Sequence, residues 1–405
     1  MPWKEVGPME LREEFVLRAR MPGANIAALC REHGISRKTG YKWLARFEQR
    51  GIAGLEDLSR RPARSPLALD PDVVVEVVAI RVAHPTWGAK KIVEVLKRRV
   101  PSDKMPGRAS VDRILRRVGL VQPGRPRRKA AAEGEKARAP LALARAPNEL
   151  WTVDFKGWWL AIDKQRCEPL TIRDAFSRFV LHIEVMSTNS NDAVRAVFHR
   201  VFRKFGLPAA ILSDNGPPFA ASHGVLHLTK LSAWWLALNI DVLRSRPGTP
   251  SDNGAHERMH RDMAAELQAF AALTLAHQQR ACDRWRHEFN ILRPHEALGM
   301  RSPVSVYHPS SVRYLPNAPA EPSYPDGFEV RTVSRAGSVN WKNNVGFVSH
   351  ALEYQVVGLE PAGAPAVFRV WFGTRHLGNL DFRNGRATLS PEPWFGSEVS
   401  PRQTG

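Results

Sequence analysis

Three carboxylates, Asp154, Asp214 and Glu257, have the residue type and the positions for joint chemistry. Asp154 lies on the polar face of the strand-like run LWTVDF, and Asp214 follows the apolar run PAAILS directly. Glu257 falls in the first turn of a helix predicted after the loop RPGTPSDN. Asp214 lies 60 positions after Asp154, and Glu257 lies 43 positions after Asp214, so only a folded sheet can bring the three together.

The chemistry that such acids favour is phosphodiester chemistry with divalent metal ions. Carboxylates gathered at the carboxyl ends of strands repel one another unless a cation neutralises them. Mg²⁺ and Mn²⁺ bind through a few carboxylates and keep positions open for water and phosphate. Two such ions about 4 Å apart activate the attacking oxygen and stabilise the leaving oxygen. In this interpretation Asp154 bridges both ions, Asp214 and Glu257 hold one each, and all three acids are catalytic.

Each acid taken alone also has a plainer explanation. The tripeptide Asp214-Asn215-Gly216 is a turn sequence, and a Glu in the first turn of a helix complements the helix dipole.

The elements that must position the acids follow an α/β pattern from residue 150 onward. The runs LWTVDFKGWW, EPLTIRDAFS, RFVLHIEVMS, PAAILSD and IDVLRS are predicted strands. Helices are predicted over 191–205, about 224–238, 251–270 and about 274–291. From residue 325, short strands with closely spaced turn signals are typical of a small β-barrel.

Residues 9–50 predict three helices, of which the last two have the spacing of a helix-turn-helix. Gly34 breaks the chain, and Ser36 caps a new helix whose Tyr41 and Leu44 are expected to face inward. The outward side chains expected to contact DNA are Arg37, Lys38, Thr39 and Lys42. An ordinary helical hairpin with a solvated basic face is the alternative.

A second helical unit is predicted over about 71–120, with a turn at HPTWG and Trp87 in its core. Residues 121–147 are rich in Pro, Gly, Ala and Arg and predict a linker. The linker side chains expected to track phosphates, or otherwise to be a solvated charge run, are Arg125, Arg127, Arg128 and Lys129.

Composition narrows the classes of partner. The 405 residues include 59 Lys and Arg against 40 Asp and Glu, and the net charge of +19 favours a polyanion such as DNA, with a membrane surface as the alternative. No apolar run approaches the roughly 18 residues of a membrane span, so no membrane partner is expected. Three scattered cysteines argue against a disulfide framework and fit a reducing cytoplasm.

Five motifs in order, over about 160 residues, carry a family resemblance. They are LWTVDF, DAFSRFVL, SDNGPPF, SRPGTPSDNGAHERMHR and FNILRPHEALGMRSPVSVY. This region resembles the catalytic core of insertion-sequence DDE transposases and retroviral integrases. The resemblance implies an RNase H-like fold, an Asp-Asp-Glu triad of Asp154, Asp214 and Glu257 that binds Mg²⁺ or Mn²⁺, and transposon-end DNA as substrate. The upstream helical segments also resemble the end-binding modules of bacterial members.

Two features depart from the family pattern. The interval between Asp214 and Glu257 is several residues longer than is typical, with the excess in AASHGVLHLTK, where a surface insertion costs little. A helix-turn-helix also replaces the His/Cys zinc-binding domain of retroviral integrases, which favours the bacterial branch and a cytoplasmic, nucleoid-associated protein. Other acids carry less weight: in the resemblance Asp174 is a hairpin residue and Asp252 a helix cap, and Asp163 and Glu266 have no feature to recommend them.

The sequence therefore predicts a multidomain fold with all-α helix-turn-helix modules, a central α/β RNase H-like core and a C-terminal β-barrel. The expected divisions are 1–64 and 65–120 for the two helical domains, 121–147 for the linker, 148–310 for the core, 311–392 for the barrel and 393–405 for a disordered tail.

The predicted function is that of a DNA transposase. The enzyme is expected to cleave at the terminal inverted repeats and to transfer the 3′-hydroxyl to target DNA, with two metal ions in each site. Joining two ends implies a homo-oligomer on DNA; nothing indicates a helper protein. Around the catalytic helix, His256, Arg258, His260 and Arg261 are expected either to contact DNA or to form a solvated face. The alternatives are an inactive or domesticated DNA-binding protein and a nuclease without joining activity.

Overall fold

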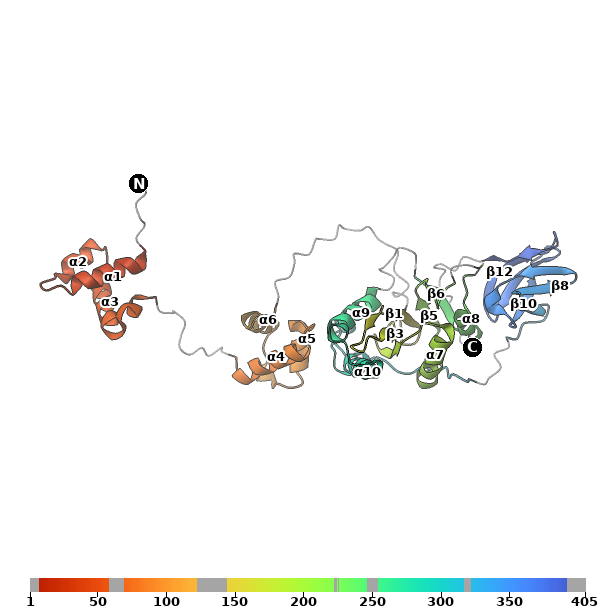
Figure 1. Ribbon diagram of the computed structural model, residues 1–405, viewed down its shortest axis with the longest axis horizontal. Coiled ribbons are helices and arrows are strands. Elements are labelled where there is room, and N and C mark those ends of the chain that lie inside the picture. Colours follow the sequence, from red (N-terminus) through yellow and green to blue (C-terminus); the bar gives the residue numbers. More distant parts are fainter. Residues whose placement is uncertain are drawn as a thin grey trace. The chain divides into compact units, whose positions relative to one another are not determined.

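The computed structural model describes residues 7–57, 69–121, 144–221, 224, 226–245, 254–316 and 322–391. Arg125, Arg127, Arg128 and Lys129, most of the predicted linker, Asp252 and the predicted tail lie outside these residues. The chain divides into two compact units, Met1–Ala68 and Leu69–Gly405. Figure 1 labels the elements along the chain.

The first unit is a three-helix domain. Its helices are α1 (Pro8–Ala19), α2 (Ile26–Glu32) and α3 (Arg37–Arg50), followed by the 3₁₀ turn η1 (Gly51–Leu55). Asn25 and Ser36 cap α2 and α3, since their side chains accept hydrogen bonds from the amides of Ala28 and Thr39. The predicted helix-turn-helix is confirmed.

One expectation about α3 is wrong. Tyr41 was expected to face inward but is 58% exposed, whereas Gly40 and Trp43 face the core. A Cβ at position 40 would lie 2.6 Å from the Cys30 sulfur, so α3 packs closely on α2 there. Trp43 has the larger apolar surface to bury, and this decides the rotation of the helix.

The second unit begins with three helices, α4 (Pro71–Ala83), α5 (Ala89–Leu96) and α6 (Arg108–Arg117), with the 3₁₀ turn η2 (Ser102–Lys104) between the last two. We call residues 69–121 the helical module. Trp87 is 1% exposed and stacks on His84 with ring centroids 3.9 Å apart, so the expectation that it is a core residue is confirmed.

The central sheet contains the strands expected to carry the acids. These are β1 (Leu150–Phe155), β2 (Trp159–Leu160), β3 (Arg166–Asp174), β4 (Val180–Met186), β5 (Ala210–Ser213) and β6 (Asp241–Arg244). The strand order is β2-β3-β1-β5-β6, and β4 pairs with β3. β5 is parallel to both β1 and β6, whereas β3 is antiparallel to β1. The predicted strand order along the chain and the α/β class are confirmed.

Helices cover both faces of this sheet (Figure 1). They are α7 (Asn191–Phe205), α8 (Lys230–Ala237), α9 (Gly254–Glu266) and α10 (Leu275–Ile291), with the 3₁₀ turns η5 (Gln268–Phe270), η6 (Glu296–Leu298) and η7 (Pro303–Ser305). Trp151 and Val153 of β1 pack with α7 and α8, whereas α9 and α10 pack with Val180 and Ile183 of β4. Residues of β1 therefore alternate between two helical layers.

The C-terminal region is made of strands, as expected. They are β7 (Glu329–Thr332), β8 (Ser338–Trp341), β9 (Asn344–Phe347), β10 (Val356–Pro361), β11 (Val367–Phe372), β12 (Arg375–Asp381), β13 (Ala387–Thr388) and β14 (Ser390–Pro391), with the 3₁₀ turn η8 (His350–Leu352). They form one sheet in the order β14-β12-β11-β10-β7 and another in the order β13-β9-β8. Strand pairing among the described residues closes neither sheet on itself, so the predicted barrel is not confirmed.

Candidate active site

The parallel pairing of β1 and β5 places two of the predicted acids at the same level. Leu150 pairs with Ala210 and Thr152 with Leu212. Asp154 and Asp214 each lie two positions beyond this last pair, on neighbouring strands. The apolar stretch before each acid is buried, because it passes through the centre of the sheet.

The pKa of Asp154 is shifted by its burial and by the other two acids. Its side chain is 20% exposed. Burial, the Asp214 carboxylate and, more weakly, the Glu257 carboxylate raise the pKa of Asp154 to about 7, against partial relief from the Phe155 amide and Lys156. The structure thus brings Asp154 into the field of both Asp214 and Glu257, although these residues are distant in sequence.

Asp214 ends β5 in a polar turn. It is exposed, but partial desolvation by the surrounding protein raises its pKa, and the Gly216 amide opposes this by donating to Oδ1 at 3.3 Å. The Asn215 side chain donates to the Ser245 carbonyl at 2.7 Å and so ties the turn to the end of β6. The turn therefore positions the Asp214 carboxylate. The turn sequence and a chemical role for this acid are compatible explanations.

Glu257 is exposed in the first turn of α9, and the residue before it anchors the helix. His256 is fully buried, and its Nδ1 lies 2.8 Å from the Thr152 hydroxyl while its Nε2 lies 2.6 Å from the Thr171 hydroxyl. His260, one turn further on, places Nε2 2.8 Å from the same Thr171 hydroxyl. We call Thr152, Thr171, His256 and His260 the threonine–histidine cluster.

The protonation of this cluster follows from hydrogen-bond counting. Thr171 Oγ1 donates its one hydrogen to the Asp154 carbonyl at 2.9 Å, so the Nε2 atoms of His256 and His260 both donate to it. His256 Nδ1 then accepts from Thr152. Burial, with help from neighbouring cations, lowers the pKa of His260 to about 3 and that of His256 well below its usual range. Both rings are neutral.

The prediction that His256 and His260 contact DNA or form a solvated face is therefore wrong. They are 0% and 9% exposed and hold α9 against β1 and β3. Their spacing of four residues on one helix face was visible in the sequence. Their partners were not, because Thr152 and Thr171 become neighbours only through the register of β1 and β3.

Asp154 and Asp214 fit a divalent metal ion by their chemistry. Hard cations prefer carboxylate oxygens, and a cation would relieve the repulsion that raises the pKa of Asp154. Glu257 contributes to the same field but remains exposed. Within the described ranges, no group of three or more His, Cys, Asp and Glu side chains is spaced to hold a metal ion. The pair of aspartates is thus the donor set that fits.

Glu266, to which the sequence assigned no role, is a hydrogen-bonding centre at the end of α9. Its carboxylate accepts from Trp285 on α10, from the fully buried Arg293 and from the Thr86 hydroxyl of the helical module. Arg293 also donates to Asp262 at 2.7 Å.

The predicted DNA contacts within the described residues differ in accessibility. Arg37, Lys38 and Lys42 are exposed on α3, and Arg258 and Arg261 are exposed on α9. The Thr39 hydroxyl lies 2.9 Å from that of Ser36, so it belongs to the cap of α3.

Family models match most of these regions. A helix-turn-helix domain matches residues 11–63 and a homeodomain-like domain matches 39–115. Two models of the integrase core domain match residues 144–250 and 238–303. Among the helices of the described residues, none has the length and apolar content that crossing a bilayer requires.

Curated relatives are insertion-element proteins. The chain is 30% identical over 250 residues to the insertion element IS407 uncharacterized 31.7 kDa protein of Burkholderia multivorans, covering 60% of this chain and 85% of that one. It is 27% identical over 248 residues to the transposase InsD for insertion element IS2A/D/F/H/I/K of Escherichia coli, covering 58% and 77%. A solved structure of the HTLV-2 integrase catalytic core domain in complex with magnesium shares 16% identity, covering 40% of this chain and 99% of that one, with a TM-score of 0.32.

The fold and the matched domains define a DNA-binding polynucleotidyl transferase with an integrase core. The chain belongs to the insertion-sequence transposases, the family of its curated relatives, which acts in DNA transposition.

Proposed function

We propose that this chain cleaves the ends of its transposable element and joins the resulting 3′-hydroxyl to target DNA. The observation that supports this most is that Asp214 and Glu257, from a strand end and a helix start, both raise the pKa of Asp154 at the sheet centre. Placing like charges close together lowers the stability of a fold. Such destabilising arrangements are common at catalytic sites.

Asp154, Asp214 and Glu257 would hold two Mg²⁺ or Mn²⁺ ions, with Asp154 as the shared ligand. Bound there, the ions supply activation of the attacking oxygen and stabilisation of the leaving oxygen. Glu257 is exposed and has a long, flexible side chain, so it would complete the set by changing rotamer while α9 stays fixed.

The threonine–histidine cluster has a positioning role in this proposal. Neutral His256 and His260 fix the start of α9 over β1 and β3 without bringing positive charge to the acids. Their neutrality leaves the negative field of Asp154 and Asp214 available for cations.

The DNA partners of the proposal are the terminal inverted repeats of the element and a target duplex. The helix-turn-helix of the first unit would recognise the ends through Arg37, Lys38 and Lys42. Since two ends must be joined to one target, we propose a homo-oligomer assembled on DNA.

The test is a product assay with an end-labelled duplex that carries the terminal repeat, a supercoiled plasmid and Mg²⁺. Asp154→Asn should lower both cleavage and joining by at least about 100-fold, since it removes the shared ligand. Asp163→Asn changes an exposed acid outside the site and should leave both activities intact.

Three outcomes count against the proposal. Full joining by Asp154→Asn would contradict the assigned acids. Cleavage without joined products by the wild-type chain would identify a nuclease. End binding with neither reaction would identify a DNA-binding protein that retains the fold without the chemistry.

A further inference from the structure

Within the second unit, a cavity of about 1200 Å³ opens between the helical module and the catalytic core. Residues from α5 and α6 line one side, and residues from α9, the β3–β4 turn and η6 line the other. Seven of the lining side chains are Lys or Arg, and three are Asp or Glu. Its walls are joined by the Thr86–Glu266 hydrogen bond and by His84 Nδ1, which lies 2.9 Å from a Glu288 carboxylate oxygen.

The three acids of the cavity already have cationic partners. The pairs are Lys90 with Glu296 at 3.0 Å, Arg116 with Asp112 at 2.8 Å, and Arg293 with Asp262 at 2.7 Å. Their direct ion pairs are therefore made with cations other than Lys91, Arg108, Arg178 and Arg258.

Five of the lining cations lie outside these pairs. Arg173 of β3 is buried, and the other four each come from a different element. Lys91 comes from α5, Arg108 from α6, Arg178 from the β3–β4 turn and Arg258 from α9. None of the four forms an ion pair with another residue of the described ranges. Burial lowers the pKa of Lys91 and of Arg178, and the nearby carboxylates of Asp262 and Glu266 for Lys91, and of Asp174 for Arg178, offset this only in part.

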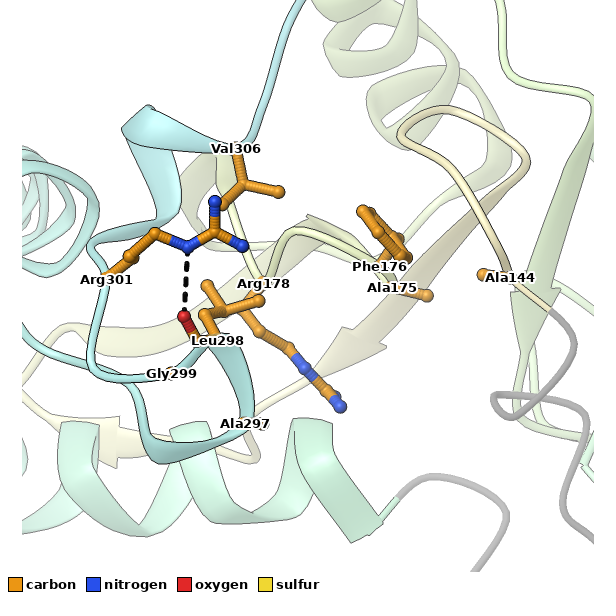
Figure 2. Close-up of a pocket in the computed structure, with 9 residues that line it drawn as sticks. All are labelled: Ala144, Ala175, Phe176, Arg178, Ala297, Leu298, Gly299, Arg301 and Val306. Atoms are coloured by element: carbon orange, nitrogen blue, oxygen red, sulfur yellow. Dashed lines mark hydrogen bonds between the residues drawn. The ribbon is translucent and has the colours of Figure 1, made fainter.

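A second cavity of about 440 Å³ continues the first one, since Arg178 and Ala297 line both. Figure 2 shows Arg178 and Arg301 as the charged side chains among its small and apolar residues. Arg301 donates from Nε to the Leu298 carbonyl at 3.1 Å, which fixes its position. We call the two cavities together the basic groove.

We propose that the basic groove binds the phosphodiester backbone of DNA that enters the active site. The groove is too large for one small anion, and its cations are dispersed over four elements, as a linear polyanion requires. Arg258, which lines the groove, directly follows Glu257 on α9, so the groove reaches the helical turn that carries one of the three acids. That DNA bound in the groove reaches the active site rests on the proposed function, whereas the binding itself does not.

The first test measures the salt dependence of DNA binding by the full chain. The Asp154→Asn background prevents cleavage, and the probe is a fluorescein-labelled duplex of random sequence. Each phosphate contact contributes about 0.9 to the slope of log affinity against log salt. The variant with Lys91→Ala, Arg108→Ala, Arg178→Ala and Arg258→Ala should lose about 3.6 from this slope if each cation makes one phosphate contact.

Matched controls remove cations of the same unit that do not line the groove. Arg98 follows α5 and Arg284 lies on α10, and both are exposed. The Arg98→Ala and Arg284→Ala variants should keep the wild-type slope. An unchanged slope in the four-residue variant overturns the proposal and would leave an acidic protein segment as the occupant to consider.

A second test reports position and does not depend on removing charge. The three native cysteines are buried, so a single surface cysteine can be labelled selectively. Ala109→Cys lines the groove and is exposed. With iron–EDTA attached, it should cut bound DNA at defined sites, whereas the same label on Arg98→Cys should cut at least about tenfold less.

These results separate the groove from the proposed function. A chain that shows the slope change and the localised cutting but joins no DNA keeps the groove and loses the function. A chain that joins DNA while both labelled cysteines cut equally keeps the function and loses the groove.

Discussion

Asp154 is the next-to-last residue of β1, with a pKa raised to about 7 by burial and by two other acids. Its charged form is disfavoured in the metal-free protein. A protonated Asp154 stabilises the fold, and this contribution is fully present below the pKa of an unfolded Asp and is lost as the pH rises through 7. The same residue is the one that a bound cation would stabilise most.

The corresponding prediction concerns pH. In EDTA, Asp154→Asn should melt at a higher temperature than the wild type at pH 8, and the difference should shrink towards zero at pH 4. The neutral amide avoids the cost of the buried charge, which exists only at the higher pH. Thermal melts of both proteins at the two pH values measure this. An equal difference at both pH values would refute the assignment.

At the scale of elements, α9 is held at both ends. The threonine–histidine cluster fastens its start to β1 and β3, and the Arg293, Asp262 and Glu266 group fastens its end to α10. Glu257 lies within the first attachment, between His256 and His260, which explains how a helix start can place an exposed side chain near the sheet centre.

The first attachment predicts a loss of order at Glu257. His256→Ala leaves the hydroxyls of Thr152 and Thr171 with fewer partners inside the protein, so the free energy of unfolding should fall by about 1–3 kcal/mol. DNA joining should fall further than the folded fraction does, because α9 is released. Urea melts and the joining assay at a temperature where both proteins are folded measure this. His287→Ala on the exposed face of α10 should change neither.

The second attachment predicts a larger loss. Arg293 is fully buried with two carboxylates, and its guanidinium lies 5.3 Å from the Trp285 ring centroid. Arg293→Met leaves Asp262 and Glu266 without their cation and should lower the free energy of unfolding by about 3–5 kcal/mol. Arg284→Met, at an exposed position of α10, should stay within about 0.5 kcal/mol of wild type in the same denaturation experiment. Similar losses in the free energy of unfolding for the two variants would mean that the buried ion pairs of Arg293 contribute nothing to stability.

At the scale of the whole molecule, the helix-turn-helix and the candidate acids lie in different compact units. The first unit, Met1–Ala68, carries the helix-turn-helix, and the second, Leu69–Gly405, carries the acids and the basic groove. The division implies that end selection and phosphodiester chemistry can be impaired separately.

A double variant of the first unit tests this separation. Arg37→Ala with Lys38→Ala should lower the preference for the terminal repeat over random DNA by about 1–3 kcal/mol if one bidentate base contact is lost. Any joining that remains on a random duplex should be unchanged. Competition binding and the plasmid assay measure the two effects, with Arg50→Ala, at the exposed end of α3, as the control. Equal weakening on both DNAs would assign these side chains to phosphate contacts.

The strands, the helices and their order were predictable because apolar periodicity and capping are local properties. Asn25 and Ser36 cap helices through residues three positions away, and the strand of Asp154 shows its alternation in six letters. The three candidate acids also came from the sequence, through their positions at a strand, a strand end and a helix start.

Only the tertiary structure decided which polar side chains are buried together. His256 meets Thr152 and Thr171 across 104 and 85 positions, and Arg293 meets Asp262 across 31. Tyr41 is exposed and Trp43 is buried because α1 and α2 select the face of α3 that they cover. The sequence by itself determined where the acids and helices lie along the chain. Which side chains become partners, and which are buried, depends on how separate elements pack. The tertiary structure therefore decided the neutral histidines, the buried arginine and the basic groove.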